Sequence, residues 1–212
     1  MKIAIIGAGN VGSALASGWA KAGHDVSLGV RNLDDSEIKT LVAANQNMSA
    51  KSVPEAAKDA EVILISVPVA ALKEVAKALG EVKGKIIIDA TNSVLHRPEP
   101  YAHGVEAFKV LTKCEDVVKC FNSTGFENMA NPQYGGIGID MFVAGSSPKG
   151  KAIAKQLARE LGFAECYDFG GDDKIALLEQ FALAWINLAI VQKHGRDMAF
   201  KILRRAHEDM QN

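Results

Sequence analysis

Three glycines near the start of the chain, Gly7, Gly9 and Gly12, have the spacing G-x-G-x-x-G. The first allows a tight turn, the second lets a pyrophosphate approach the main chain, and the third lets a helix pack closely on the preceding strand. An apolar run at residues 3–6 precedes the turn, and a helix expected at about residues 11–22 would point its free N–H groups at the phosphates. Glycine turns occur in many folds, but this combination predicts a loop that binds the phosphates of a dinucleotide.

The end of the second expected strand indicates which dinucleotide. Chains that bind NAD carry an acidic residue there, about 20 residues past the glycines, for the ribose hydroxyls. Segment 28–32 has no carboxylate, and Asp25 lies at the beginning of the strand. Arg31 stands where a 2′-phosphate would lie and could bind it through two hydrogen bonds, and Asn32 could add another. A surface arginine after a strand is the alternative, but the missing acid and the present arginine favour NADP(H).

Three later strand ends carry small or polar residues that would meet the same ligand, because dinucleotides lie across the carboxyl ends of parallel strands. They are Ser66, Val67 and Pro68 after one strand, Thr91 and Asn92 after another, and Asn122 after a third. Pro68 would pack beside the nicotinamide, and Asn122 would orient its ribose or carboxamide. Asn and Thr also suit strand exits without any ligand, so for each residue alone both interpretations stay open.

Alternating strand and helix patterns must position these residues. Strands are expected at 26–30, 62–66, 85–89, 117–121, 139–144 and 163–167, and helices at 37–44, 54–59, 69–79 and 148–161. The alternation predicts an α/β fold, a Rossmann-type, doubly wound and mostly parallel sheet. We expect residues 1–170 to form the NADP-binding domain. Residues 171–212 are expected to be helical, broken near Gly195, and to serve as a lid or a dimerisation surface.

Composition narrows the function classes. A formal net charge of -1 gives no electrostatic reason to bind nucleic acid or an anionic membrane. The three cysteines form no C-x-x-C pair, which favours a reduced, cytoplasmic setting. The apolar stretch 175–191 is interrupted by Glu179, Gln180 and Asn187, so we expect a buried or interfacial helix rather than a membrane span.

The sequence lacks the patterns of nucleophilic or metal catalysis. It has no Ser/His/Asp set, no H-E-x-x-H run and no clustered metal ligands, and His96 and His103 lie on an expected loop at 92–103. Direct hydride transfer between two rings fits this, because it needs stacking and orientation rather than a general base. We therefore expect no metal and no acid–base catalytic residue, with Asn122 as the orienting residue. Phe181, Trp185 and Leu188 form one apolar helix face, which predicts a homodimer, although the same face could cover the chain's own sheet.

Five segments, in this order, resemble the coenzyme F420-dependent NADP oxidoreductase family, which includes the cytosolic reductase domain of STEAP metalloreductases. The segments are 7–12, 29–32, 66–68, 118–122 and 143–145, and the similarity covers roughly residues 1–170. The glycine loop and the Arg-Asn pair are shared by many NADP-binding proteins. The Phe121-Asn122 strand end and the later Ala144-Gly145 are more particular to this family.

The resemblance implies hydride exchange between NADPH and a flavin-like or deazaflavin (F420) ring. It implies phosphate contacts from Gly9, Asn10 and Val11, 2′-phosphate contacts from Arg31 and Asn32, nicotinamide-side contacts from Val67, Pro68 and Asn122, and a place for Gly145 in the cofactor site. Val30 departs from the Ser or Thr that the family often has before the arginine, so one phosphate hydrogen bond is expected to be missing.

Other functions remain open at this point. The chain could be a non-catalytic NADP(H)-binding redox sensor, or a reductase of another small substrate such as a ferric chelate. Reductases resembling 6-phosphogluconate dehydrogenase or pyrroline-carboxylate reductase start with a similar strand and loop. They carry a larger helical second domain, whereas roughly 40 residues follow the expected sheet here.

Overall fold

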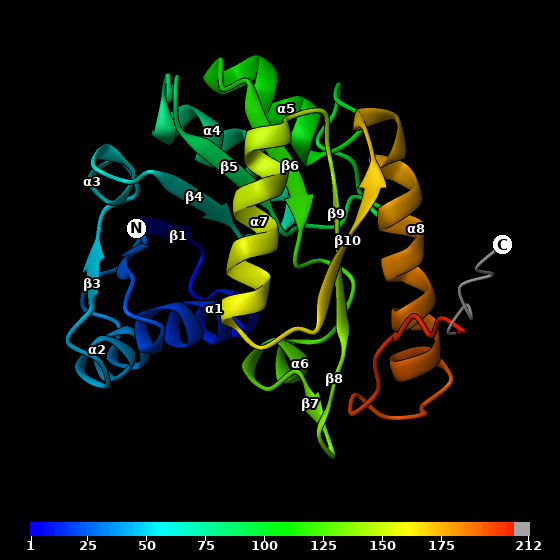
Figure 1. Ribbon diagram of the computed structural model, residues 1–212. Coiled ribbons are helices and arrows are strands. Elements are labelled where there is room, and N and C mark those ends of the chain that lie inside the picture. Colours follow the sequence, from blue (N-terminus) through cyan, green and yellow to red (C-terminus); the bar gives the residue numbers. More distant parts are fainter. Residues whose placement is uncertain (206–212) are drawn as a thin grey trace, which may run out of the picture.

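A sheet of eight strands in the order β3-β2-β1-β4-β5-β6-β9-β10 forms the centre of the protein (Figure 1). The structure, a computed structural model, describes residues 1–205 of the chain. The strands are β1 (Lys2–Ile6), β2 (Asp25–Gly29), β3 (Met48–Lys51), β4 (Val62–Ile65), β5 (Ile86–Asp89), β6 (Asp116–Cys120), β9 (Asp140–Ala144) and β10 (Glu165–Gly170). β1 to β6 are parallel, whereas β9 is antiparallel to β6 and parallel to β10.

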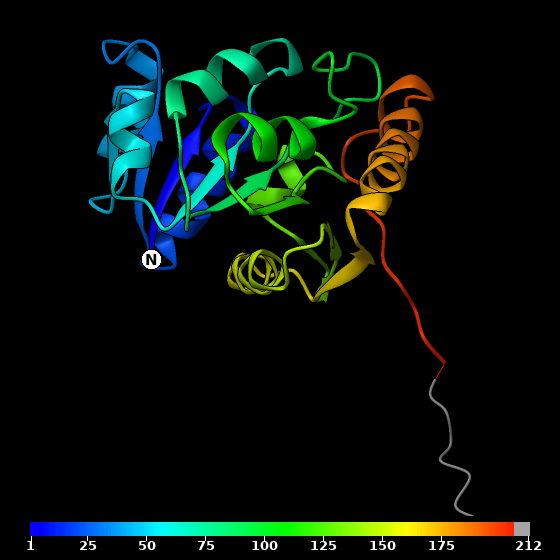
Figure 2. The same cartoon turned by 90° about the horizontal axis from the view of Figure 1, so that it is seen from above.

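Helices cover both faces of this sheet (Figure 2). Buried residues of α1 (Asn10–Lys21), α2 (Ser36–Ala43), α6 (Phe126–Ala130) and α7 (Pro148–Glu160) belong to the core on one face. Buried residues of α3 (Val53–Lys58), α4 (Leu72–Leu79), α5 (Gly104–Thr112) and α8 (Ile175–Ile186) belong to the core on the other face. Strands buried on both faces read as continuous apolar runs, and the predicted Rossmann-type, doubly wound sheet is confirmed.

Several elements escaped the sequence analysis because their signals are short. They are β3, α5, α6, and the small hairpin of β7 (Gln133–Tyr134) and β8 (Ile137–Gly138). The predicted loop at 92–103 leads directly into α5. His103 is the N-cap of that helix, where its Nδ1 accepts a hydrogen bond from the Glu106 N–H at 3.1 Å.

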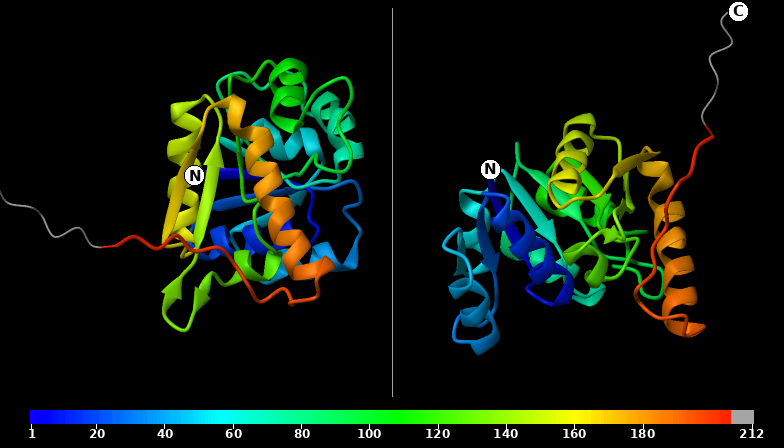
Figure 3. Two further views of the ribbon diagram at one scale, coloured as in Figure 1. Left: turned by 90° about the vertical axis from the view of Figure 1, so that its right-hand side faces the viewer. Right: turned by 60° about the horizontal axis from the view of Figure 1, so that its bottom comes forward.

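The prediction of helices from residue 172 onwards is wrong beyond Val191. α8 ends in a short π-helical turn at Asn187–Val191, and residues 192–205 contain no helix. Lys193 and Gly195 have positive φ angles, which end the helix. The segment then runs back toward β9, where the Asp140 carboxylate binds the Ile202 N–H and the Lys201 ammonium, each at 2.7 Å (Figure 3). The predicted helical residues 206–209 lie outside the described part of the chain.

The apolar face of α8 that motivated the homodimer packs largely against its own chain. The Phe181 ring lies 4.8 Å from Phe142 and 4.4 Å from Phe200 between centroids, and the Trp185 indole N–H donates to the Met198 carbonyl at 2.7 Å. The exposed large apolar side chains of this region are instead Leu177, Ile190 and Val191. Among residues 1–205, the segment Asp172–Val191 is long and apolar enough to cross a membrane, a test that core helices of soluble proteins also pass.

Candidate dinucleotide-binding site

The glycine loop joins the end of β1 to the start of α1. The three glycines differ in what a side chain would meet at each position. Gly7 has a φ of +102°, a conformation that favours glycine. A Cβ atom at Gly12 would lie 1.9 Å from the Gly7 carbonyl oxygen, so a side chain there would push the helix off the loop. A Cβ at Gly9 would have no atom within 4 Å, because this glycine faces open space. The loop therefore leaves room where a pyrophosphate must approach the main chain.

The first turn of α1 offers hydrogen-bond donors beside that space. The bond from the Ser13 N–H to the Gly9 carbonyl, at 2.8 Å, is the first of the helix, so the N–H groups of Asn10, Val11 and Gly12 have no intrahelical partner. The N-cap residue Gly9 has no side chain that could accept hydrogen bonds from these N–H groups, and the first turn contains no acidic residue. These donors and the helix dipole suit an anion.

Ser66 holds the glycine loop in place from the neighbouring strand. It follows β4, and its hydroxyl donates to the Gly7 carbonyl at 2.7 Å. Its single proton is used there, so we assign Ser66 to positioning the loop. Val67 is half-buried and Pro68 is exposed after the same strand end, where both remain open to a ligand.

Arg31 and Asn32 are exposed beside the loop, next to the end of β2. The Gly7 N–H donates to the Gly29 carbonyl at 3.4 Å, which brings the two strand ends together. Of the two carboxylates that follow, Asp34 pairs with Lys39 at 2.8 Å and Asp35 caps α2. Within residues 1–205 the Arg31 guanidinium has no ion-pair partner, so both its charge and its donors are available to a 2′-phosphate.

Asn92 and Asn122 meet at the ends of β5 and β6. The Asn122 amide donates to the Asn92 side-chain oxygen at 2.9 Å, and the Asn92 amide donates to the Asn122 carbonyl at 3.0 Å. This exchange leaves the buried Asn122 Oδ1 without a hydrogen-bond partner, and the hydroxyls of Thr91 and Ser93 are also buried and unpartnered. Such groups are rare in proteins, and a polar ligand would satisfy them. Ser93 was not among the site residues predicted from the sequence, and the structure adds it to the candidate site.

Phe121 produces the turn that presents Asn122. It has a φ of +59° although it is not glycine, and an aromatic residue in this region is an outlier. Its fully buried ring packs edge to face against Trp19, with 5.4 Å between centroids. Backbone strain of this kind gathers at functional sites, where the surrounding packing holds it.

Gly145 does not lie in this site. It follows β9, which runs antiparallel to β6 and ends with Ala144 paired to Lys119, so the chain at Gly145 already runs back toward the start of β6. A Cβ at Gly145 would contact the main chain of Val117 and Val118, near the start of β6. The resemblance placed Gly145 with the cofactor residues, and the structure corrects this: its φ of +145° and its close packing give it a structural role.

A buried charge cluster lies beside the Asn92–Asn122 pair. The Lys119 ammonium is 2.8 Å from an Asp89 carboxylate oxygen and 2.7 Å from one of Glu179, and all three side chains are almost fully buried. The sequence analysis missed this cluster, although a lysine inside the apolar strand 117–121 is a signal that could have indicated it. His103 lies on the same side, and burial, together with the Lys119 charge, lowers its pKa.

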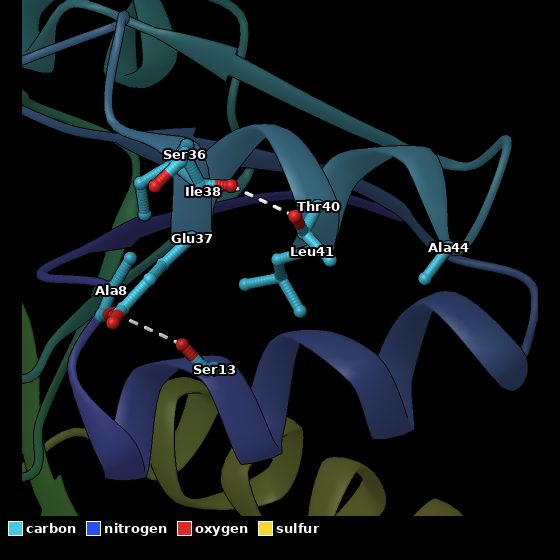
Figure 4. Close-up of a pocket in the computed structure, with 8 residues that line it drawn as sticks. All are labelled: Ala8, Ser13, Ser36, Glu37, Ile38, Thr40, Leu41 and Ala44. Carbon is cyan, nitrogen blue, oxygen red and sulfur yellow. Dashed lines mark hydrogen bonds between the residues drawn. The ribbon is translucent and has the colours of Figure 1, made fainter.

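A pocket of about 510 Å³ opens between α1 and α2 on the other side of the glycine loop (Figure 4). Its lining carries no basic side chain, and Glu37 extends across it toward the loop. A phosphate group would be repelled by that carboxylate. We therefore place the phosphates at the first turn of α1 and not in this pocket. Among the described residues, no group of three or more His, Cys, Asp or Glu side chains is arranged to hold a metal ion.

The strand ends fit a dinucleotide along one edge of the sheet. The free N–H groups of α1 and the space beside Gly9 suit a pyrophosphate, Arg31 suits a 2′-phosphate, and the unpartnered Asn122 oxygen suits an amide or hydroxyl donor. Their contacts with a cofactor stay predictions.

Comparisons with known proteins agree with this geometry. Residues 2–93 match the family described as NADP oxidoreductase coenzyme F420-dependent. The glycerol-3-phosphate dehydrogenase [NAD(P)+] of Limosilactobacillus reuteri is 35% identical over 92 residues, which are 38% of this chain and 27% of that protein. The enzyme of the same description from Thermoanaerobacter sp. is 26% identical over 146 residues, 63% of this chain and 41% of that protein. The chain thus spans between a quarter and a half of the length of these curated relatives.

Solved structures match nearly the whole chain. A proposed F420-dependent NADP reductase from Arthrobacter sp. FB24 has a TM-score of 0.80 and 25% identity, covering 96% of this chain and 100% of that one. A reductive aminase from Aspergillus terreus, solved with NADPH4, cyclohexanone and allyl amine, has a TM-score of 0.66 at 18% identity. The match covers 91% of this chain and 62% of that one and shows a shared fold. The fold is that of NAD(P)-binding dehydrogenases and reductases, and residues 2–93, somewhat less than half of the chain, are similar to the coenzyme F420-dependent NADP oxidoreductase family.

Proposed function

We propose that the protein is an NADPH-dependent oxidoreductase that transfers a hydride between NADP(H) and a flavin-like or deazaflavin (F420) acceptor. One observation carries this proposal: parallel strands bring the glycine loop, Arg31 and the Asn92–Asn122 pair to a single edge of the sheet. The family match over residues 2–93 and the similarity to the Arthrobacter protein support the acceptor class.

The chain's own residues bind and orient the cofactor. The N–H groups of the loop and α1 hold the pyrophosphate, and Arg31 selects the 2′-phosphate. Val67 and Pro68 pack beside the nicotinamide, and Asn122 Oδ1 accepts a hydrogen bond from its carboxamide or ribose. When bound, the reduced nicotinamide supplies the hydride to the acceptor ring, which requires stacking and exclusion of water rather than a general base.

Measuring NADPH oxidation against a panel of acceptors tests the proposal. The panel contains F420-type deazaflavin, FMN and FAD, ferric chelates and quinones, and each is measured with both deuterated C4 epimers of NADPH. We expect turnover with a deazaflavin or flavin and loss of deuterium from one face of C4 only. Turnover with ferric chelates alone would show that the acceptor is not a flavin or deazaflavin. Binding of NADPH without turnover on any acceptor would favour the redox sensor.

A homodimer and a cytoplasmic location are part of the same proposal. Cys114, Cys120 and Cys166 are all buried free thiols, as a reducing compartment favours. Light scattering at micromolar concentration measures the oligomeric state directly. A mass of one chain would overturn the dimer.

A further inference from the structure

We propose that Lys119 is a positioning residue, which fixes the nicotinamide end of the site by tying the Thr91 turn to α8. This inference rests on the proposed function for its role in turnover. The contacts that carry it connect Lys119 on β6, Asp89 on β5, Glu179 on α8 and the main chain of Thr91.

The three N–H donors of the Lys119 ammonium have three oxygen atoms within reach. Besides Asp89 and Glu179, the Thr91 carbonyl accepts from the ammonium at 2.6 Å. Lys119 and Asp89 are direct neighbours in the register of β5 and β6. A Cβ at Gly104 would lie 2.4 Å from an Asp89 carboxylate oxygen, so the start of α5 closes over the cluster. The lysine is therefore enclosed and held in one geometry.

The surroundings of Lys119 favour its charged ammonium form. Burial alone would favour the neutral amine, but attraction to Asp89 and Glu179 outweighs it and raises the pKa of Lys119. A buried ion cluster is poor evidence for stability, because apolar residues of similar volume often serve a fold as well. Its directional hydrogen bonds, by contrast, specify where a main-chain segment lies.

The segment that it specifies is the turn at the nicotinamide end. The Thr91 carbonyl binds Lys119, and the Thr91 N–H donates to Asp89 Oδ1 at 2.9 Å. Both main-chain polar groups of Thr91 are thus held by the cluster, and the next residue, Asn92, pairs with Asn122. The cluster sets the position of the unpartnered Thr91 hydroxyl and, through Asn92, of the unpartnered Asn122 oxygen.

Replacing all three charged residues of the cluster by uncharged ones separates a role in positioning from a role in stability. Replacing Lys119→Met alone would leave two buried carboxylates, so the informative variant combines Asp89→Asn, Lys119→Met and Glu179→Gln. It keeps the shapes and an acceptor for the Thr91 N–H but removes the donor to the Thr91 carbonyl. Lys109→Met is the matched control, because Lys109 pairs with Asp172 at 2.5 Å on the same side of the sheet and does not touch Thr91.

The readout is binding of NADPH and of adenosine 2′,5′-bisphosphate, a fragment that lacks the nicotinamide and its ribose, measured by calorimetry. We expect the wild-type protein and the Lys109→Met control to prefer NADPH. In the triple variant, NADPH should bind about three- to fivefold more weakly, with affinity for the fragment unchanged. Unchanged NADPH affinity, equal losses for both ligands, or no preference in the wild-type protein would each overturn the positioning role.

Turnover provides a second readout that also separates this inference from the proposed function. If an acceptor is found, kcat of the triple variant should fall about 10- to 100-fold, because a small misplacement of reacting groups has such an effect. A triple variant that folds and keeps its kcat would overturn the positioning role. If no acceptor is reduced by the wild type, the proposed function fails while the binding comparison still decides the role of Lys119.

Discussion

The two ends of the candidate site are built in different ways. The phosphate end consists of main chain and one exposed side chain, Arg31, within a short stretch of sequence and beside open space at Gly9. The nicotinamide end consists of buried side chains from distant segments, including Asn92, Asn122 and Phe121 with its positive φ. The phosphate end therefore depends on glycines, which have no side chain. The nicotinamide end depends on long-range contacts that hold its side chains in place. Substitutions at the two ends should have different signatures.

The largest effect is expected from Gly12→Ala, at the phosphate end. The new Cβ would clash with the Gly7 carbonyl, so the loop must shift, and we expect a loss of stability of about 3 kcal/mol or more together with loss of NADPH binding. Gly9→Ala is the matched control, because its Cβ meets no atom; it should fold normally and weaken only NADPH. Thermal melts and calorimetry measure both, and a Gly12→Ala protein that binds NADPH normally would contradict the steric argument.

Arg31→Ala tests the specificity of the same end. A charged hydrogen bond contributes about 1.5–3 kcal/mol, so NADPH should bind about 10- to 100-fold more weakly. Because Arg31 has no partner in the described chain, stability and NADH affinity should hardly change. Equal losses for NADPH and NADH in calorimetry would show that Arg31 does not bind the 2′-phosphate.

Asn122→Ala should show the opposite signature at the nicotinamide end. It removes the unpartnered Oδ1 and the bond to Asn92, so the ring loses its orientation while the phosphates remain bound. We expect kcat to fall about tenfold or more, with a smaller change in NADPH affinity. A comparable fall in affinity with unchanged kcat in steady-state kinetics would place Asn122 among the binding residues only.

The smallest effect concerns pH. Burial lowers the pKa of His103, so the unfolded chain binds a proton there more readily than the native protein. Stability should therefore be full above about pH 6.5 and decrease as the pH falls below it. His103→Asn keeps an N-cap for α5 without a titrating group, and its urea-unfolding free energy should lose this part of the pH slope. An unchanged slope would exclude His103 as its source.

The sequence predicted features that lie within short segments, but not those that depend on contacts between distant residues. The sheet, its strand ends and the position of the glycine loop follow from glycine spacing, apolar runs and their alternation. The predicted fold is confirmed, whereas phosphate binding by the loop stays a prediction. The Lys119–Glu179 contact joins residues 60 positions apart, and the positive φ of Phe121 depends on Trp19, so no local pattern carries either. Gly145 was misplaced because nothing in residues 139–144 shows that β9 reverses direction.

Because β9 runs antiparallel to β6, the chain that follows β9 leads away from the candidate site, toward the start of β6. The start of β6 lies beside the first turn of α7, where the Ser147 hydroxyl donates to the Asp116 carboxylate at 2.6 Å and Lys149 is exposed. A fluorophore or an immobilising tether attached at Lys149 would sit at the other end of the parallel strands from the candidate dinucleotide-binding site. A biosensor or a supported catalyst attached at this position would therefore keep its tether remote from the candidate dinucleotide-binding site.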